Sequence, residues 1–335
     1  MHSHHSHSGD YVAHGVDKLE DMVSRTIELE FQIYCLTEHM PRINSKFLYP
    51  EETSSTKNDT ESLEKLQDNF SKFLRHASEI KERNSSKPTA FIIGTEIEGC
   101  DIEHIDYAKT ILEKHKDTIK FAVGSIHHVN SIPIDFDQKN WNKALSSSKN
   151  NIKNFLLDYY ELQYIMLQKL KPLVVGHFDL YKLLIPSDLK INIHTGDIAY
   201  DDDDVNNMMI SDIELENNWE IVQATIIRNL KYINSYGGLI EINTSALRKN
   251  LSEPYPGSII CKLVKEHCQG RFVLSDDAHA ISHIGTNYKK ALEYMTDTIH
   301  LDEIYHLEET SNGEIKVVSQ PLTEFSRSNF WNNLD

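Results

Sequence analysis

Short apolar segments recur along the chain and alternate with longer stretches in which apolar residues follow a helical period. The short segments are rich in β-branched residues, which is typical of parallel strands buried on both faces. They span residues 33–36, 90–94, 121–123, 173–175, 239–242 and 272–274. Between them, residues 16–30 and 151–169 place apolar side chains at helical spacing. This alternation predicts a parallel α/β architecture.

Two stretches interrupt the alternation. Residues 44–88 are rich in Ser, Thr, Asn and Lys around one amphipathic helix, which we predict at about 61–83. Residues 186–218 contain the acidic run 201–204, which we interpret as a solvated loop, with a loop that orders over an active site as the alternative. Residues 303–319 predict a hairpin that turns at Asn312-Gly313. Because the chain has no internal repeat and no linker, we predict one domain over residues 1–335.

Charge and cysteine content narrow the classes of partner. The 335 residues include 51 acidic and 34 basic side chains, and the net charge of −17 opposes binding to DNA or anionic membranes. A small anionic substrate is compatible with this charge if bound cations supply local positive potential. The four cysteines form no CxxC pair, no apolar run has the length of a membrane span, and the N-terminus lacks an apolar signal core. We therefore expect a cytoplasmic protein with no nucleic-acid or membrane partner, whose oligomeric state stays open.

Histidine and acidic residues stand where the predicted strands end. They are His5 and His7 in the N-terminal segment, His14 one loop later, and His39, Glu96, His127, His177, Asp277 and His279 after the later strands. A single histidine in a strand is more often a core residue, but a β/α barrel gathers the carboxyl ends of all its strands on one face. Residues at alternate positions, such as His5 and His7, also point to the same side. We therefore predict a polynuclear metal site with imidazole and carboxylate ligands at the mouth of a seven-stranded barrel, with an open doubly wound sheet as the alternative fold.

The N-terminal histidines have a second interpretation, as an expression tag. A purification tag is normally uninterrupted, whereas this segment alternates His with Ser and continues into Gly9-Asp10-Tyr11. We therefore retain His5 and His7 as candidate ligands and leave His2 and His4 outside the site.

These residues, in this order, resemble the PHP (polymerase and histidinol phosphatase) family of metallohydrolases. The matching segments are His5-Ser6-His7, Thr37-Glu38-His39, Gly94-Thr95-Glu96, Ser125-Ile126-His127, Gly176-His177-Phe178-Asp179 and Asp276-Asp277-Ala278-His279. Asn243-Thr244-Ser245-Ala246-Leu247-Arg248, followed by Pro254-Tyr255-Pro256, makes the chain most similar to fungal members. The resemblance implies a distorted (β/α)7 TIM-like barrel and the hydrolysis of L-histidinol phosphate to L-histidinol and phosphate in histidine biosynthesis.

The resemblance also implies three divalent metal ions, which for such ligands are Zn, Fe or Mn. The implied ligands are His5, His7, Glu96 and Asp277 for the first ion, Glu96, His127 and His177 for the second, and His14, His39 and His279 for the third. The chain departs from the family at Ser3, where an acidic residue commonly precedes the HxH pair. This position lies outside the ligand set, so we expect the site to persist.

A mechanism follows from this ligand set. Two ions bridged by Glu96 would hold a hydroxide that attacks phosphorus in line, and Asp277 or a metal-bound water would protonate the leaving alcohol. Arg248, just beyond a strand end, is the first candidate to bind the phosphate, and Arg42 is the second. For each arginine the alternative is a surface salt bridge. The cationic groups of the substrate would be matched by Glu98, Asp179 or the acidic run 201–204.

Two other functions remain open. A PHP-type phosphoesterase acting on nucleotides, nucleic-acid ends or other small phosphomonoesters would use the same ligands, although the charge of −17 opposes a nucleic-acid substrate. A non-catalytic scaffold that has lost the chemistry is disfavoured, because every expected ligand position is filled. The favoured prediction is an enzyme with a small phosphomonoester substrate.

Overall fold

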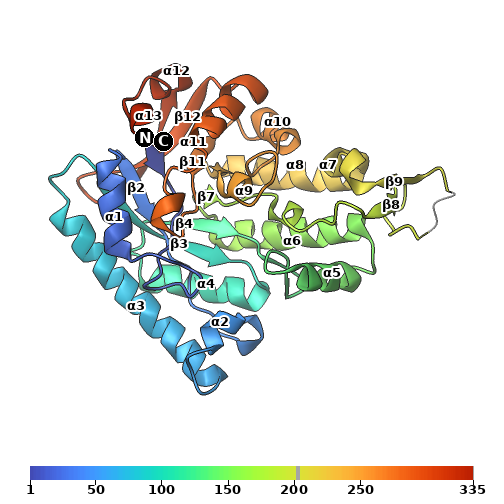
Figure 1. The fold of residues 1–335 in the computed structure, drawn as a ribbon, viewed down its shortest axis with the longest axis horizontal. Coiled ribbons are helices and arrows are strands. Elements are labelled where there is room, and N and C mark those ends of the chain that lie inside the picture. Colours follow the sequence, from blue (N-terminus) through green and yellow to red (C-terminus); the bar gives the residue numbers. More distant parts are fainter. Residues whose placement is uncertain (201–203, 335) are drawn as a thin grey trace.

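The computed structural model describes residues 1–200 and 204–334, and its centre is a seven-stranded sheet that curls into a nearly closed barrel (Figure 1). In spatial order the strands are β1 (His2–Ser3), β2 (Ile33–Leu36), β3 (Ala90–Glu98), β4 (Phe121–Ser125), β7 (Val174–Val175), β10 (Leu239–Asn243) and β11 (Phe272–Ser275). All neighbours pair in parallel. The first and last strands meet where the His7 amide donates to the Ala278 carbonyl at 2.8 Å. The predicted barrel is confirmed, and the open doubly wound sheet is wrong.

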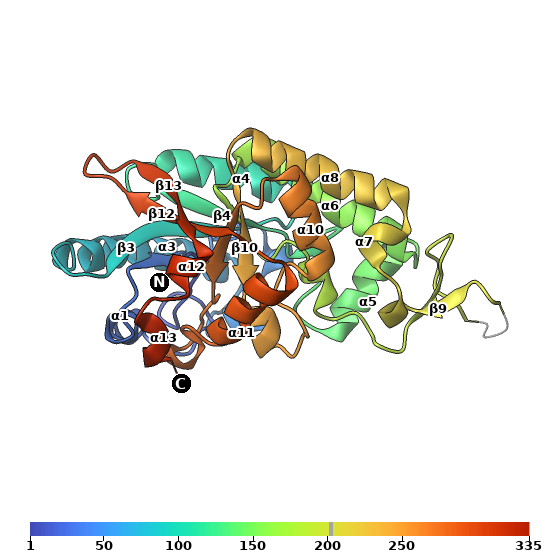
Figure 2. The ribbon, with the colours of Figure 1, turned by 90° about the horizontal axis from the view of Figure 1, so that it is seen from above.

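Helices cover the outside of the barrel (Figure 2). The longer ones are α1 (Leu19–Glu28), α3 (Asp59–Arg83), α4 (Ile102–Lys114), α5 (Gln138–Ser147), α6 (Ile152–Leu170), α8 (Glu220–Ser235) and α10 (Ser258–His267). The shorter ones are α2 (Pro50–Thr53), α7 (Leu215–Asn218), α9 (Ser245–Arg248), α11 (Tyr288–Glu293), α12 (Leu322–Phe325) and α13 (Phe330–Asn333). Asp101 and Asn151 begin α4 and α6 by accepting a hydrogen bond from a backbone amide of the first turn. The helices predicted at 16–30, 61–83 and 151–169 are thus present as α1, α3 and α6.

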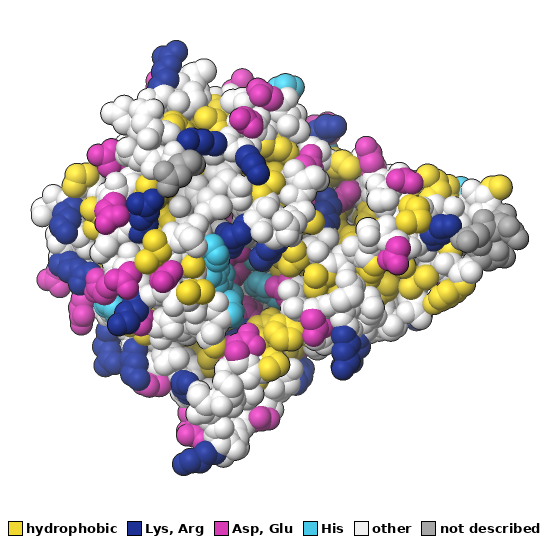
Figure 3. Space-filling model, viewed as in Figure 1, with side chains coloured by type: hydrophobic (Ala, Val, Ile, Leu, Met, Phe, Trp, Pro, Cys, Tyr) yellow, Lys and Arg dark blue, Asp and Glu magenta, His cyan; other side chains and the backbone are white. Residues whose placement is uncertain are grey.

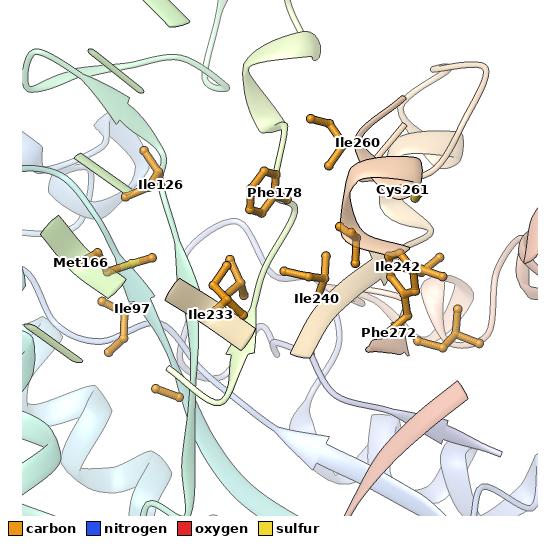
Figure 4. Close-up of a cluster of buried hydrophobic side chains, with 14 of the residues drawn as sticks. Ile97, Ile126, Met166, Phe178, Ile233, Ile240, Ile242, Ile260, Cys261 and Phe272 are labelled. Atoms are coloured by element: carbon orange, nitrogen blue, oxygen red, sulfur yellow. The ribbon is translucent and has the colours of Figure 1, made fainter. Parts of the chain in front are cut away.

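Alternation along β10 separates an apolar exterior from a polar interior. Ile240 and Ile242 pack beneath the surrounding helices, in the cluster that Figure 4 shows. Glu241 between them is fully buried and points the other way, into the barrel, where it contacts His5. Further down, the interior is apolar and is filled by a separate cluster that includes Cys35, Val174 and Leu307. The acidic and histidine side chains of the predicted site therefore lie at the carboxyl ends of the strands, beyond this apolar cluster.

Three hairpins extend from the barrel. β5 (His128–Val129) and β6 (Ile132–Pro133) follow β4 directly, and β12 (Glu303–Glu309) pairs with β13 (Ile315–Pro321) as predicted for the C-terminal region. β8 (Lys190–Asn192) and β9 (Asn207–Met209) form an arm that projects from the molecule (Figure 1). Of the predicted acidic loop, residues 201–203 lie outside the described residues, and Asp204 is exposed. Among the described helices, none has the length and hydropathy of a membrane span.

Candidate metal centre

The predicted ligands meet at the carboxyl ends of the barrel strands. They follow β1 (His5 and His7), β2 (His39), β4 (His127), β7 (His177) and β11 (Asp277 and His279). Glu96 lies within β3, which continues to Glu98, four residues beyond the predicted end. Histidine side chains gather at the base of a hollow in the surface (Figure 3), and the cavity there measures about 390 Å³.

Glu96 is at the centre of the cluster, and both of its oxygens face histidines. Oε2 lies 3.3 Å from His5 Nε2, 3.4 Å from His7 Nε2 and 2.9 Å from His39 Nδ1. Oε1 lies 3.0 Å from His177 Nε2 and 3.4 Å from His127 Nε2. One carboxylate therefore lies between two sets of nitrogen donors, as a bridging ligand requires.

Asp277 completes the first set. Its Oδ1 lies 3.8 Å from His5 Nε2 and 3.6 Å from His7 Nε2. The donor atoms of His5, His7 and Asp277 lie within 4.8 Å of one another, and so do those of Glu96, His127 and His177. Buried nitrogens of this cluster, including Nε2 of His5 and of His7, have no hydrogen-bond partner among the described residues. Such a set of nitrogen and oxygen donors fits divalent metal ions.

The residues predicted for a third ion also come together. His14 Nε2 and His279 Nε2 are 3.1 Å apart, and the donor atoms of His279, His39 and His7 lie within 4.8 Å of one another. His14 is the most exposed of them, with 37% of its side chain accessible, because it is on the loop that precedes α1. His39 Nδ1 also faces carboxylates, at 2.9 Å from Glu96 and 3.0 Å from Glu98.

Within the cluster, histidines and carboxylates shift each other's pKa so that imidazolium and carboxylate charges balance. Burial raises the pKa of the Glu96 carboxyl, but His5 and His39 outweigh burial and hold this pKa well below its usual range. Burial lowers the pKa of His39, but Glu96 and Glu98 beside it raise the pKa to about 10. Against burial, Glu96 and Glu241 likewise raise the pKa of His5 well above its usual value. A cation that enters the cluster must therefore displace protons from imidazolium groups.

Glu241 is a buried residue beside the cluster that the sequence analysis missed. Its Oε1 accepts a hydrogen bond from His5 Nδ1 at 2.9 Å, and its Oε2 accepts from the His177 amide at 2.9 Å and from Asn243 Nδ2 at 2.9 Å. The contact fixes the His5 ring so that Nε2 faces Glu96. The available signal was a glutamate inside an otherwise apolar strand, where a buried acid needs a polar partner.

Glu241→Gln is expected to weaken metal binding by about 10- to 100-fold, because the neutral amide holds the His5 tautomer less strongly. The loss should appear both in a metal titration of the purified protein and in kcat/KM, while the circular dichroism spectrum is unchanged. Glu64→Gln, on the exposed face of α3, is the matched control. Wild-type metal affinity in Glu241→Gln would exclude this positioning role.

The sequence analysis named Arg42 as the second candidate to bind the phosphate, but the structure places it away from the cavity. The guanidinium is buried, with Nη1 2.5 Å from Glu52 and Nη2 2.7 Å from Glu98, and it does not line the cavity. Both ends of the guanidinium fork are therefore already bound. Since Glu98 contacts His39, Arg42 holds the carboxylate that orients this predicted ligand.

Arg248 does line the cavity, and so does its neighbour Lys249. Arg248 donates to the carbonyls of Asp276 at 3.1 Å and of Asp277 at 3.0 Å. Asp277 has a positive φ of 49°, so these bonds stabilise a strained turn that carries a ligand. The Lys249 ammonium is exposed and, within the described part of the chain, has neither a hydrogen bond nor an ion pair; the sequence analysis did not identify it.

The N-terminal histidines belong to the fold. His2 and His4 are buried, and β1 pairs with β2. His4 Nδ1 lies 3.0 Å from the Leu274 carbonyl, and its Nε2 accepts from the Leu307 amide at 3.2 Å. The expression-tag interpretation is therefore wrong, and leaving His2 and His4 outside the ligand set agrees with the structure.

A β/α barrel with a cluster of imidazole and carboxylate groups at the carboxyl ends of its strands is typical of metal-dependent enzymes with this fold. A model of the PHP domain matches residues 3–245, and the chain belongs to this family. The histidinol-phosphatase of Saccharomyces cerevisiae is 49% identical over 339 residues, which cover 100% of both chains. The family predicted from the sequence is thus confirmed.

Solved structures share the fold. A structure from Listeria monocytogenes matches with a TM-score of 0.60 at 23% identity, covering 87% of this chain and 99% of that chain. The histidinol phosphate phosphatase of Lactococcus lactis, complexed with zinc, L-histidinol and phosphate, matches with a TM-score of 0.53 at 14% identity and covers 94% of this chain and 98% of that chain. At these identities the matches establish the architecture alone.

Proposed function

We infer that this chain is a histidinol-phosphatase, which hydrolyses L-histidinol phosphate to L-histidinol and phosphate. The observation that carries this conclusion is the 49% identity with the yeast histidinol-phosphatase over its entire length. The geometry agrees with it, because seven of the nine implied ligand residues line one cavity, as do the cationic Arg248 and Lys249. The other two, His5 and His7, face Glu96 and Asp277 of that lining.

The proposed centre holds three divalent ions, of Zn, Fe or Mn. The proposed ligand sets are His5, His7, Glu96 and Asp277; Glu96, His127 and His177; and His14, His39 and His279. When bound, such ions activate water and offset the charge of the phosphoryl group. Imidazole and carboxylate donors accept all three of these metals.

The chain's own residues bind the phosphate and keep the Asp277 carboxylate ionised. Lys249 supplies an ammonium group that lines the cavity for the phosphate oxygens, and Arg248 adds positive potential while it holds the Asp277 turn. Burial raises the pKa of Asp277, but His5 and His279 lower it well below its usual range. Asp277 is thus held as a carboxylate, and we propose that water, and not Asp277, gives the leaving alcohol its proton.

The substrate assignment predicts a clear order of rates in a panel of phosphomonoesters. Metal-loaded protein should release phosphate from L-histidinol phosphate with a kcat/KM at least about tenfold above that for AMP, p-nitrophenyl phosphate or a 3′-phosphorylated oligonucleotide. Tenfold corresponds to about 1.4 kcal/mol of discrimination between transition states. Faster turnover of AMP or of the oligonucleotide would instead support a nucleotide phosphoesterase.

A further inference from the structure

The cavity has two chemically different walls. Arg248 and Lys249 line it near Asp277, at the end of β11, whereas Asp135 and Phe136 line it near His127, at the end of β4. Two strands separate β4 from β11 in the sheet order, the largest separation that a closed seven-stranded barrel allows. Basic side chains border the histidine-lined hollow, and hydrophobic side chains lie around it (Figure 3).

Asp135 is held in place by the hairpin that follows β4. β5 and β6 pair, and the amide of the buried Ile134 donates to the His127 carbonyl at 3.0 Å. Asp135 Oδ1 is shielded from solvent, and no residue of the described chain donates a hydrogen bond to it. A shielded carboxylate oxygen without a donor is costly, and a cationic or N–H group of a ligand in the cavity would offset that cost.

Two aromatic rings stand beside this carboxylate. Phe136 is 40% exposed and stacks on Tyr49 with ring centroids 5.3 Å apart and an interplanar angle of 14°. The Arg42 guanidinium lies over Tyr49, 4.5 Å from the ring centroid, and is itself fixed by Glu98. A flat apolar surface next to an acceptor suits a planar ring that carries an N–H donor.

We propose that Asp135 accepts a hydrogen bond from the imidazole ring of the substrate, while Phe136, supported by Tyr49 behind it, forms the apolar surface against which the ring packs. The phosphate then lies toward Lys249, at the other wall. This assignment rests on the proposed function, since L-histidinol phosphate carries an anionic group at one end and an imidazole at the other. It replaces Glu98 and Asp179 as candidates for this role, because Arg42 already pairs with Glu98 and Lys182 already pairs with Asp179.

The test compares three substrates in Asp135→Asn. We expect kcat/KM for L-histidinol phosphate to fall about 10- to 100-fold, the range for a hydrogen bond to a charged group. The values for p-nitrophenyl phosphate and O-phosphoethanolamine, which lack the imidazole, should stay within about twofold of wild type. Phe136→Leu, at an exposed position where folding is not at risk, should lower the L-histidinol phosphate value by several-fold and leave the value for O-phosphoethanolamine, which has no ring, within about twofold of wild type. Asp117→Asn, on an exposed loop, is the matched control and should change none of them.

The outcomes separate this proposal from the function on which it rests. If wild-type protein does not prefer L-histidinol phosphate, the proposed function fails. If wild type shows the preference and Asp135→Asn retains it, the assignment of Asp135 fails. An equal loss on all three substrates would mean that Asp135 positions His127 and does not contact the ring. A loss shared with O-phosphoethanolamine alone would assign Asp135 to the ammonium and overturn the proposal.

Discussion

Replacement of Glu96 by glutamine is expected to lower kcat/KM for L-histidinol phosphate at least about 10³-fold, or about 4 kcal/mol. One oxygen of this carboxylate faces His5 and His7, and the other faces His127 and His177. A glutamine keeps the shape but removes the negative charge, and its NH₂ group cannot act as a ligand. Both ligand sets should therefore lose affinity together. Parallel assays of released phosphate and of bound metal per chain measure the two effects.

The fold should survive this change, because Glu96 contributes to β3 mainly through backbone pairing with β4. The control is Glu113→Gln, which makes the same chemical change at an exposed position of α4 outside the cavity and should behave as wild type. If Glu96→Gln retained wild-type activity with a full metal content, the bridging role would be refuted. If it lost activity but kept all its metal, Glu96 would act on the reaction without linking the two sets.

The strand ends were predictable because the barrel imposes them. Parallel strands must be connected by crossovers, so their carboxyl ends share one face, and polar residues after apolar runs mark that face in the sequence. β3 was predicted to end at residue 94 but continues to Glu98, because polar residues in the barrel mouth do not always end a strand. Ile97 packs in the outer core, while Glu96 and Glu98 on either side of it face the cavity. Inside a barrel mouth a strand can thus alternate apolar and acidic residues and continue, although its apolar run has ended.

Partners that meet only in three dimensions were not predictable. Glu241 and His5 are 236 positions apart, and Arg42 and Glu98 are 56 apart. Nothing near Arg42 in the sequence distinguishes a buried arginine fixed by two acids from one that faces a phosphate. Asp135 was missed because β5 and β6 are too short for periodicity to reveal them, so the return of the chain to His127 had no sequence signature.

Removal of the bound metal should abolish activity, leave the protein folded, and make reloading strongly dependent on pH. The protein should remain folded because imidazolium groups balance the carboxylates when no cation is bound: burial lowers the pKa of His39, yet Glu96 and Glu98 raise it to about 10. A zinc finger needs its metal to fold, whereas this protein has an apolar core that supports the strands that carry the ligands. Dialysis against a chelator, followed by circular dichroism and a phosphate-release assay, tests both statements.

The pH dependence follows from the direction of those pKa shifts. A ligand imidazole must be neutral, so the ion bound by His5 and the ion bound by His39 must each displace a proton from that imidazole. Against burial, Glu96 and Glu241 raise the pKa of His5, and Glu96 and Glu98 raise that of His39. Apparent metal affinity should therefore rise with pH between about 6 and 9, and calorimetry in two buffers of different ionisation enthalpy should detect proton release. Bound metal should also raise the melting temperature, because it adds about 4 kcal/mol to the free energy of unfolding when the free ion exceeds its Kd a thousandfold. Affinity that is independent of pH would mean that the imidazoles are already neutral, and full activity with less than about a tenth of an equivalent of metal would show that no ion is required.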